Sequence, residues 1–381
     1  MKKVLFIATI PSSIKEFSLD FMRFIRNRGF YVEAIAGIGS QAEFVRQQGF
    51  KCHEIEIARG INPIKDIISL FKIKKIIQDG NFDLVHTQTA KAGFIGRIAA
   101  WTEKVPIIIH TAHAWPFHPF LSFWKKKYYL YLEKLAGKLC DAIIVDSKEV
   151  KRYGQSFKVA PESKVHQIYM GIDLERFKPC GDEQKVEFRR RLNIPIEKII
   201  VGAISRLVND KGIETIIECA DALKTNFNVE FLILGEGEQR EKFEKMITAR
   251  GLNEKIHLLG YINDVLPYLQ AFDIFFLPTW REGFGVVFAE AQACGIPVIS
   301  SKIAPLDEVV SDNCSGFLFP PNSVVQFVEA TIKLFDKERR RKMGECGVKH
   351  IRENFDLRRI NEQTLSLYQS LFNQKTLFYK L

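Results

Sequence analysis

Short apolar runs alternate with longer amphipathic stretches along most of the chain. The runs are rich in Val and Ile and lack polar alternation, so they predict strands buried on both faces. Stretches such as Phe17–Arg28 and Ile64–Gln78 predict helices between them. This alternation predicts an α/β fold with parallel sheets covered by helices. The expected strands are Val4–Thr9, Val32–Ala36, Leu84–Thr87, Ile107–Thr111 and Ala142–Asp146, then Ile199–Ser205, Val229–Leu234, Ile256–Leu259, Ile274–Leu277 and Val298–Ser300.

The pattern breaks between Met170 and Pro195, where Pro179, Gly181 and a charged segment indicate a linker and a lead-in helix. We therefore predict two Rossmann-like, doubly wound domains, residues 1–175 and 176–355, that face a cleft. A last helix, within 356–381, is expected to pack across the junction and cross back to the first domain. Ligands of open parallel sheets bind beyond the carboxyl ends of the strands, so the loops after strands are the candidate sites.

Composition excludes several classes of protein. The 381 residues are 46% hydrophobic and 26% charged, as in an ordinary globular protein. No apolar run approaches the ~20 residues that span a bilayer. The start, Met1–Ile7, is basic and then apolar like a signal peptide, but its apolar part has only a strand's length and predicts a first strand. The seven cysteines include no CxxC pair, so we expect neither a disulfide framework nor a zinc site, and a reducing cytoplasm fits.

The net charge of +10 is placed unevenly. Residues 1–175 hold 26 basic and 17 acidic residues, whereas residues 176–381 hold 29 and 28. A basic half suggests an anionic partner, and solubilising surface charge is the alternative. Phe123–Leu132 combines cations with aromatics, and Phe17–Arg28 adds three arginines, a composition typical of helices at an anionic membrane surface. Core aromatics beside a solvated face explain it equally well. The predicted fold argues against nucleic acid.

The strongest motif is Glu282-Gly283-Phe284-Gly285-Val286-Val287-Phe288-Ala289-Glu290, directly after a predicted strand. Its glycines allow close approach of the backbone to a ligand. A helix beginning near Gly285 would point free N–H groups at a phosphate. Eight helical residues span about 12 Å, so Glu282 and Glu290 could contact opposite ends of a nucleotide sugar. A capping glutamate and a structural salt bridge are the alternative, which the glycines and the strand–loop–helix context disfavour.

Two further loops follow predicted strands. Ser205-Arg206-Leu207-Val208-Asn209-Asp210-Lys211-Gly212 places two cations before a helix, as a diphosphate clamp would. Solvated surface charge explains either cation alone, but less readily both in one strand-end loop. In Leu234-Gly235-Glu236-Gly237-Glu238, the two glycines indicate close approach to a ligand or, as readily, a structural turn.

Together these motifs resemble the retaining glycosyltransferases of family 4, which have the GT-B fold. The likeness extends through Cys294-Gly295-Ile296-Pro297-Val298 to Ser315–Pro321 and covers most of the chain in family order. It implies that Arg206 and Lys211 hold the donor diphosphate, that Glu282 with the amides of Gly283, Phe284 and Gly285 holds the sugar, and that Glu290 holds the ribose. It also places Gly235, Gly237, Tyr261 and Ile262 at the donor. At Ala304–Glu308 the chain lacks the two glycines that the family often has before the Glu.

Histidines and small polar residues follow the strands of the first half. His86 and His110 to His113 fall at adjacent predicted strand ends. In similar enzymes of bacterial surface-polysaccharide synthesis, a His-Gly-Trp or His-Gly-Phe histidine faces the donor sugar. His113-Ala114-Trp115 matches with Ala for Gly, so the resemblance gives His113 that role. Ser12, Ser13 and Lys91 are weaker acceptor-side candidates, and surface charge explains Lys91 almost as well. The loop after the first predicted strand lacks the GxGxxG motif, and this argues against a dinucleotide-binding dehydrogenase.

The resemblance implies transfer of a hexose-type sugar from a nucleotide diphosphate donor, UDP favoured, to a glycan or lipid-diphosphate-linked acceptor. No Asp-x-Asp occurs in the sequence, so neither a metal nor another cofactor is expected. The expected location is the cytoplasm, with peripheral attachment to the inner face of the membrane as a hypothesis. The alternatives are a nucleotide-sugar epimerase of the same fold and a non-catalytic sugar-nucleotide-binding protein.

Overall fold

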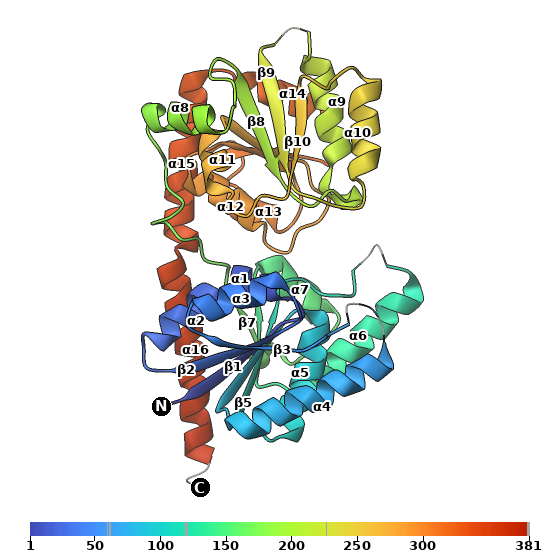
Figure 1. The fold of residues 1–381 in the computed structure, drawn as a ribbon, viewed down its shortest axis with the longest axis vertical. Coiled ribbons are helices and arrows are strands. Elements are labelled where there is room, and N and C mark those ends of the chain that lie inside the picture. The colour runs from blue at the N-terminus through green and yellow to red at the C-terminus, as the bar shows by residue number, and fades with distance from the viewer. Residues whose placement is uncertain (59, 61, 119–120, 226, 379–381) are drawn as a thin grey trace. The chain divides into compact units, whose positions relative to one another are not determined.

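A computed structural model describes residues 1–58, 60, 62–118, 121–225 and 227–378. The chain divides into two compact units, one made of Met1–Met170 with Arg359–Leu381 and the other of Gly171–Arg358 (Figure 1). Each unit contains one parallel sheet with helices on both faces, so the predicted α/β class with two doubly wound halves is confirmed.

The sheet of the first unit has seven strands in the order β3-β2-β1-β4-β5-β6-β7. The order reverses between β1 and β4, which pair directly with each other. The first-half motifs therefore meet around this reversal, at the carboxyl ends of the central strands. The strands are β1 (Lys3–Ile7), β2 (Tyr31–Ala36), β3 (Lys51–Glu54), β4 (Leu84–Gln88), β5 (Ile107–Ala112), β6 (Ala142–Val145) and β7 (Val165–Gln167).

Helices cover both faces of this sheet. On one face, α1, α2 and α3 share a buried apolar cluster with the last helix, α16. On the other face, α4 and α5 pack with partly buried side chains of α6 and α7 against a second cluster. The helices are α1 (Pro11–Phe17), α2 (Leu19–Arg26), α3 (Ser40–Gln47), α4 (Pro63–Gly80), α5 (Ala90–Thr102), α6 (Phe123–Lys138), α7 (Lys148–Ser156) and α16 (Leu357–Phe378).

The last helix, α16, is part of the core of the first unit. Ile360, Leu365 and Tyr368 are buried in the cluster that it shares with α2 and β1. The Tyr368 hydroxyl lies 2.6 Å from Nδ1 of His86 on β4. The last helix therefore completes a core that is otherwise formed by the N-terminal part of the chain.

The sheet of the second unit has six strands in the order β10-β9-β8-β11-β12-β13, with the reversal between β8 and β11. The strands are β8 (Ile199–Ile204), β9 (Val229–Leu234), β10 (Ile256–Gly260), β11 (Ile274–Leu277), β12 (Val298–Ser301) and β13 (Gly316–Phe319). The helices are α8 (Asp182–Arg191), α9 (Ile213–Leu223), α10 (Arg240–Ala249), α11 (Leu266–Ala271), α12 (Val286–Ala293), α13 (Leu306–Val309), α14 (Val324–Lys333) and α15 (Lys337–Phe355).

Every strand expected from the apolar runs is present, with ends shifted by at most two residues. Three short edge strands were missed: β3 and β7, whose sequences are polar or mixed, and β13, which is apolar but has only four residues. The helix expected over Phe17–Arg28 is wrong at its start, because α1 ends at Phe17 and α2 begins at Leu19.

The first unit contains a buried ion pair between two of its helices. Arg97 of α5 is fully buried, and its Nη2 donates to Oε2 of Glu133 on α6 over 2.8 Å. Its Nε donates to the carbonyl of Gly93 over 2.8 Å. The pair fixes α5 against α6, and neither charge has water as an alternative partner.

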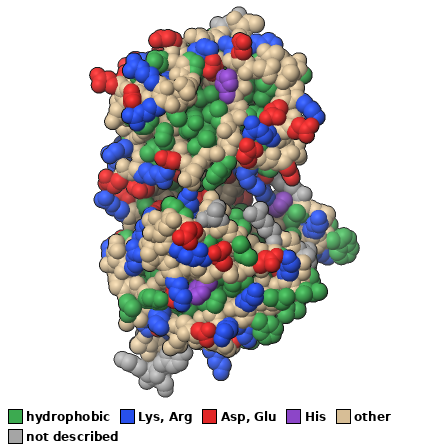
Figure 2. Space-filling view, in the orientation of Figure 1, with side chains coloured by type: hydrophobic (Ala, Val, Ile, Leu, Met, Phe, Trp, Pro, Cys, Tyr) green, Lys and Arg blue, Asp and Glu red, His purple; other side chains and the backbone are tan. Residues whose placement is uncertain are grey.

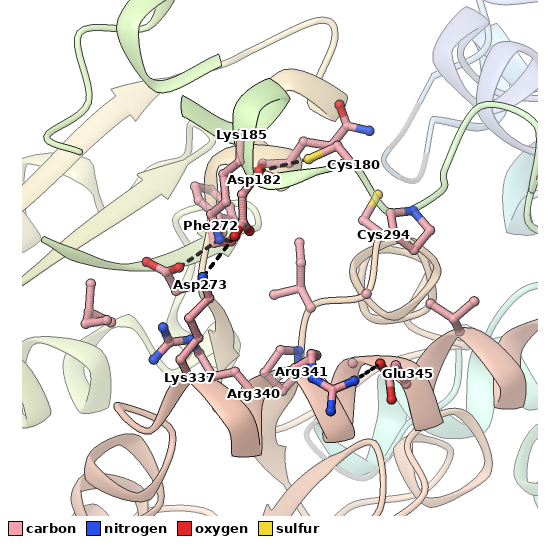
Figure 3. Close-up of a pocket in the computed structure, with 18 of the residues that line it drawn as sticks. Cys180, Asp182, Lys185, Phe272, Asp273, Cys294, Lys337, Arg340, Arg341 and Glu345 are labelled. Carbon is pink, nitrogen blue, oxygen red and sulfur yellow. Dashed lines mark hydrogen bonds and ion pairs between the residues drawn. The ribbon is translucent and has the colours of Figure 1, made fainter. Parts of the chain in front are cut away.

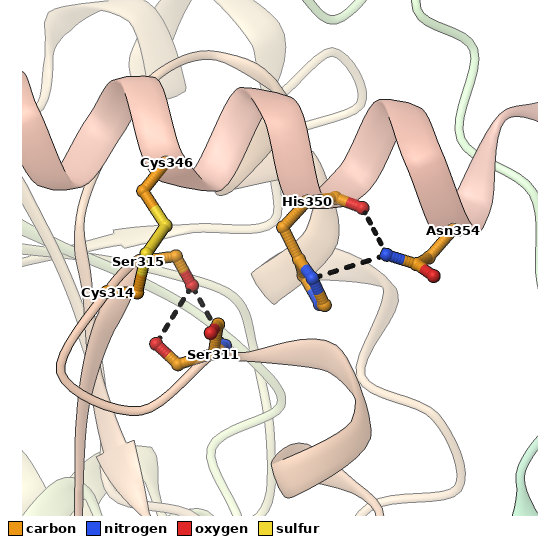
Figure 4. Close-up of a disulfide and its surroundings, with 6 residues drawn as sticks. All are labelled: Ser311, Cys314, Ser315, Cys346, His350 and Asn354. Carbon is orange, nitrogen blue, oxygen red and sulfur yellow. Dashed lines mark hydrogen bonds between the residues drawn. A yellow bond between two sulfur atoms is a disulfide. The ribbon is translucent and has the colours of Figure 1, made fainter.

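The expectation of no disulfide is wrong for one pair of cysteines. Cys314, before β13, is bonded to Cys346 of α15, with their Cα atoms 5.9 Å apart (Figure 4). Ser311 and Ser315 close the turn that presents Cys314, since the Ser311 amide donates to Oγ of Ser315 over 2.9 Å. The partners are 32 residues apart in sequence, so spacing motifs could not reveal them. Among the described residues, no helix is both long and apolar enough to cross a membrane.

Candidate active site

An ion pair marks the strand-order reversal of the second unit. Lys211 lies in the loop after β8, and Glu282 lies in the loop after β11, the neighbouring strand. Nζ of Lys211 is 2.6 Å from Oε1 of Glu282, and the two side chains are only 12% and 15% exposed. Crevices at such reversals are where open parallel sheets bind ligands. The structure thus brings two of the predicted site residues into direct contact.

Backbone contacts hold these two loops together. The Trp280 amide donates to the carbonyl of Asp210 over 2.9 Å. Oγ1 of Thr279 lies 3.1 Å from the same carbonyl. Gly212 has φ of +69°, and a Cβ there would lie 2.1 Å from the Pro278 carbonyl oxygen. Only glycine fits this approach, so the positions of Lys211 and Glu282 are set by backbone packing.

Helix α12 begins directly after the Glu282 loop. Gly285 precedes it with φ of +90°, in the left-handed region that favours glycine. The first N–H groups of a helix have no partner inside it and favour anions. The Phe284 side chain is buried against Phe355, with ring centroids 5.3 Å apart, and this contact anchors the loop before α12. Glu290 is half-buried on this helix, eight residues after Glu282.

The remaining predicted cation, Arg206, and the predicted donor residues after β10 are at least partly accessible to solvent. Arg206 is exposed, and no hydrogen bond or ion pair joins its guanidinium to another residue in the described ranges. Tyr261 is 61% exposed just beyond β10, and Ile262 is half-buried beside it. These residues follow strands on the same side of the reversal as Lys211, since β10 and β9 extend the sheet from β8.

Two predicted donor glycines serve the packing of loops. A Cβ on Gly235 would lie 1.8 Å from the Ser205 carbonyl oxygen, and one on Gly237 would lie 2.3 Å from that of Leu207. The Gly235 amide also donates to the Gly260 carbonyl over 2.7 Å. The loops after β8, β9 and β10 are therefore joined into one layer. This close approach of backbones supplies a structural reason for both glycines.

In the first unit, His113 is held by residues from three other elements. Its Nδ1 is 2.7 Å from Oδ2 of Asp146, after β6, and its Nε2 is 3.3 Å from Oε1 of Gln88, at the end of β4. Its ring lies 4.3 Å, centroid to centroid, from the ring of Phe17. His113 is thus fixed in orientation while part of its ring stays exposed. Gln88 and Asp146 were not identified from the sequence as partners of His113. Both lie at the ends of strands, and this position was the signal that could have revealed them.

The other two histidines do not join this site. His86 is buried, with Nε2 2.7 Å from Oγ1 of Thr111, and burial lowers its pKa to about 3. His110 is buried next to Gly93, and burial lowers its pKa well below the usual value. Their place near adjacent predicted strand ends was only suggestive of a site, and His113 alone was assigned a role there. His86 and His110 lie within strands, and they are neutral members of the core at neutral pH.

The weaker acceptor-side candidates have structural contacts of their own. Ser12 and Ser13 lie in the first turn of α1, where Ser13 is buried and Ser12 is half-buried. Nζ of Lys91 is 2.5 Å from Oδ2 of Asp66 on α4. Lys91 is therefore already paired with a carboxylate. Among the described residues, no group of three His, Cys, Asp or Glu side chains is placed to hold a metal ion.

Two family models match the chain, one in each half. Residues 16–176 match Glycosyltransferase Family 4, and residues 184–350 match Glycosyl transferases group 1. A galactosyltransferase of Escherichia coli, named UDP-Gal:alpha-D-GlcNAc-diphosphoundecaprenol alpha-1,3-galactosyltransferase, is 30% identical over 74% of this chain and 73% of its own length. The capsular polysaccharide biosynthesis glycosyltransferase CapM of Staphylococcus aureus is 26% identical over 98% of both chains.

Solved structures share the fold. HepE from Anabaena, solved with UDP and glucose, matches with a TM-score of 0.85 at 20% identity, over 97% of this chain and all of its own. A sucrose-phosphate synthase from Thermosynechococcus elongatus matches with a TM-score of 0.81 over 98% of this chain and all of its own, also at 20% identity. At this identity the likeness shows the fold alone.

Proposed function

The chain belongs to glycosyltransferase family 4, and we propose that it is a retaining enzyme of bacterial surface-polysaccharide synthesis. It would transfer a hexose from a nucleotide diphosphate sugar, with UDP as the favoured nucleotide, to a glycan or lipid-diphosphate-linked acceptor. The observation that carries the proposal is the Lys211–Glu282 pair at the strand-order reversal, beside the start of α12. The names of the relatives, which include a UDP-galactose enzyme and a capsule enzyme, support the donor and the pathway.

In this proposal the second unit stabilises the departing diphosphate. An ammonium group donates three hydrogen bonds, so Lys211 can keep Glu282 and still meet a phosphate oxygen. Arg206 adds a bidentate donor, and the first amides of α12 add fixed dipoles. These groups act where negative charge grows as the sugar–phosphate bond breaks, a contribution that often dominates catalysis. The proposed mechanism needs no metal for this step.

Glu282 and His113 are proposed to meet the donor sugar. Glu282 is an acceptor for sugar hydroxyls, and its pairing with Lys211 fixes its carboxylate. His113 is fixed by Asp146 and Gln88, so its exposed edge can be aimed at one place. The acceptor hydroxyl then attacks from the face that the diphosphate leaves. Glu290 is proposed to accept hydrogen bonds from the ribose diol.

Thermal unfolding in EDTA with UDP, GDP, ADP or CMP tests the donor. We expect one nucleotide to stabilise the wild-type protein, by about 2.7 kcal/mol at 100-fold saturation, because it binds only the folded state. Glu290→Ala should reduce this shift, whereas Glu244→Ala, which removes an exposed carboxylate of α10, should not. A shift that appears only when a divalent metal replaces EDTA would contradict the metal-free mechanism. UDP giving no shift while another nucleotide does would overturn the choice of base.

We also propose that the first unit docks on an anionic membrane at the inner face. Helices α4, α5 and α6 lie on one face of the first unit, which we call the α4–α6 face (Figure 1). All three helices expose apolar side chains. Hydrophobic side chains gather over this part of the unit in Figure 2. Single exposed apolar residues are ordinary, but a set this large indicates a contact surface. The set is Ile64, Ile67, Ile68, Phe71, Trp101, Phe123, Trp124, Tyr128, Tyr131 and Leu135.

Lysines alternate with these apolar residues. Lys72 of α4 and Lys125, Lys127 and Lys138 of α6 are exposed, and such cations near anionic lipid contribute about 1 kcal/mol each. The arginines of Phe17–Arg28 do not belong to this face. They lie on or just after α2, on the other side of the sheet, where Arg23 pairs with Asp20 and Arg28 with Glu362. The proposed membrane surface is therefore restricted to the α4–α6 face.

Vesicle flotation tests this surface. We expect the protein to float with vesicles containing anionic lipid and much less with neutral ones. Ile67→Ser, Phe71→Ser and Trp124→Ser together should lower the bound fraction at least tenfold, because they remove the exposed apolar contacts. Val325→Ser with Ile332→Ser is the control, since both residues are exposed in the second unit. Equal flotation of all three proteins, or equal binding to neutral vesicles, would contradict the proposal.

A further inference from the structure

A groove of about 890 Å³ lies in the second unit, between α8, α15 and one end of the sheet (Figure 3). Its floor includes Ile199 at the start of β8, Asp273 just before β11 and Pro297 just before β12. Its walls are α8 and α15. The groove is thus at the amino ends of the strands, whereas the proposed donor site is at their carboxyl ends. Its volume is within the range of small-molecule sites.

The side chains that line this groove are mainly basic, although the second unit as a whole is slightly acidic. Residues 171–358 hold 26 Lys and Arg and 29 Asp and Glu, so the unit has a net charge of −3. The groove is lined by eight Lys and Arg and only four Asp and Glu. Cations are therefore concentrated here against the charge of the surroundings, and a concave surface of one sign attracts small ions of the other. A solubilising role would not require this concentration.

Five of the cations come from one face of α15: Lys337, Arg340, Arg341, Lys349 and Arg352. Lys337 pairs with Asp182, and Arg341 pairs with Glu338 and Glu345. In the described part of the chain, no hydrogen bond or ion pair engages the side chains of Lys349 and Arg352, which are exposed. They are three residues apart on a helix, so both can reach one anion.

The floor of the groove is rigid and partly apolar. Buried Arg189 donates to Asp273 over 2.5 Å and to the carbonyl of Ala271 over 3.0 Å. Lys185 shares the Asp273 carboxylate, and burial still lowers the pKa of this lysine. Asp273 is therefore already occupied by two cations. Ile296, Pro297 and Val348 add apolar surface to the lining.

We propose that this groove binds a small organic phosphate, with the phosphate against Lys349 and Arg352 and an apolar or planar body over Ile296, Pro297 and Val348. The site is separate from the donor site. Cys294 and Gly295 line the groove, so it lies at the C-terminal end of α12. The proposed donor site is at the other end of this helix, where Gly285 precedes its first residue. The proposal does not depend on the function proposed above.

Isothermal titration with AMP tests the proposal, with inorganic phosphate as the probe without a body. We expect wild-type protein to bind AMP more tightly than inorganic phosphate. Lys349→Ala with Arg352→Ala should weaken AMP binding at least tenfold. Arg339→Ala with Lys342→Ala removes the same charge from α15 outside the groove and should change it less than twofold. Equal losses in the two double variants, or no AMP binding by the wild type, would overturn the proposal.

Lys211→Ala separates this site from the donor site. Anion binding at the groove should persist in Lys211→Ala and be lost in Lys349→Ala with Arg352→Ala. The reverse result would show that AMP occupies the donor site and would overturn the groove proposal, while leaving the proposed transferase function intact.

Discussion

Lys211→Ala should lower kcat for sugar transfer by about 10²–10³, the loss typical of one group that stabilises charge in the transition state. The side chain is nearly buried, and it is the cation that the backbone of two loops places beside the start of α12. Its loss removes charge from the proposed diphosphate site and leaves Glu282 without this partner. Initial rates with the nucleotide sugar identified by thermal unfolding provide the measurement.

Lys224→Ala is the matched control for this result. Lys224 also pairs with a carboxylate of the second unit, that of Asp221, but this pair is exposed to solvent at the C-terminal end of α9. Its removal should leave kcat within twofold. Folding of both variants is checked by their melting temperatures without nucleotide. If Lys211→Ala were folded and transferred sugar at the wild-type rate, the assignment of diphosphate stabilisation to Lys211 would fail.

Glu133→Ala should destabilise the first unit by about 3–5 kcal/mol. It leaves Arg97 charged and fully buried without the carboxylate that now accepts from it, and uncompensated buried charges cost this much. Urea unfolding followed by the fluorescence of Trp101, Trp115 and Trp124, which all lie in the first unit, measures the change. All variants are compared in a Trp280→Phe background, which removes the tryptophan fluorescence of the second unit.

Two companion variants separate the buried pair from general effects of truncation. Glu149→Ala breaks a surface pair with Arg152 on α7 and should cost less than about 1 kcal/mol. Arg97→Met with Glu133→Leu replaces both charges by apolar side chains of similar size and should recover most of the loss. A Glu133→Ala protein as stable as Glu149→Ala would show that Arg97 finds another partner.

The fold was predictable because buried parallel strands have a simple signature. Runs such as Ile107–Ile109 and Ile274–Leu277 are apolar throughout, and each lies in an interior strand of its sheet. The edge strand β3, Lys51–Glu54, is mostly polar, with the sequence Lys-Cys-His-Glu, and carries no such signal. The Cys314–Cys346 bond was missed for a related reason, because it depends on α15 passing the turn before β13. Contacts between distant segments have no local pattern.

The candidate site was predictable where its chemistry depends on strand ends. Lys211 and Glu282 were both expected at the donor, but their direct pairing follows from the adjacency of β8 and β11, which the sequence does not state. His86 shows the limit of this signal. It lies near a predicted strand end, which was suggestive of a site, but its side chain contacts Tyr368 of a helix 282 residues later. Side-chain direction, not position along the chain, decided that outcome.

The contribution of α16 to the first unit has a consequence for how the protein is made on the ribosome. Residues 1–170 emerge first, but the cluster around Phe6 and Phe21 lacks Tyr368 and Leu371 until the last helix has been synthesised. The second unit, Gly171–Arg358, is continuous and can complete its core earlier. We expect the nascent first unit to expose an apolar groove throughout synthesis of the second, which makes it the part that chaperones must protect.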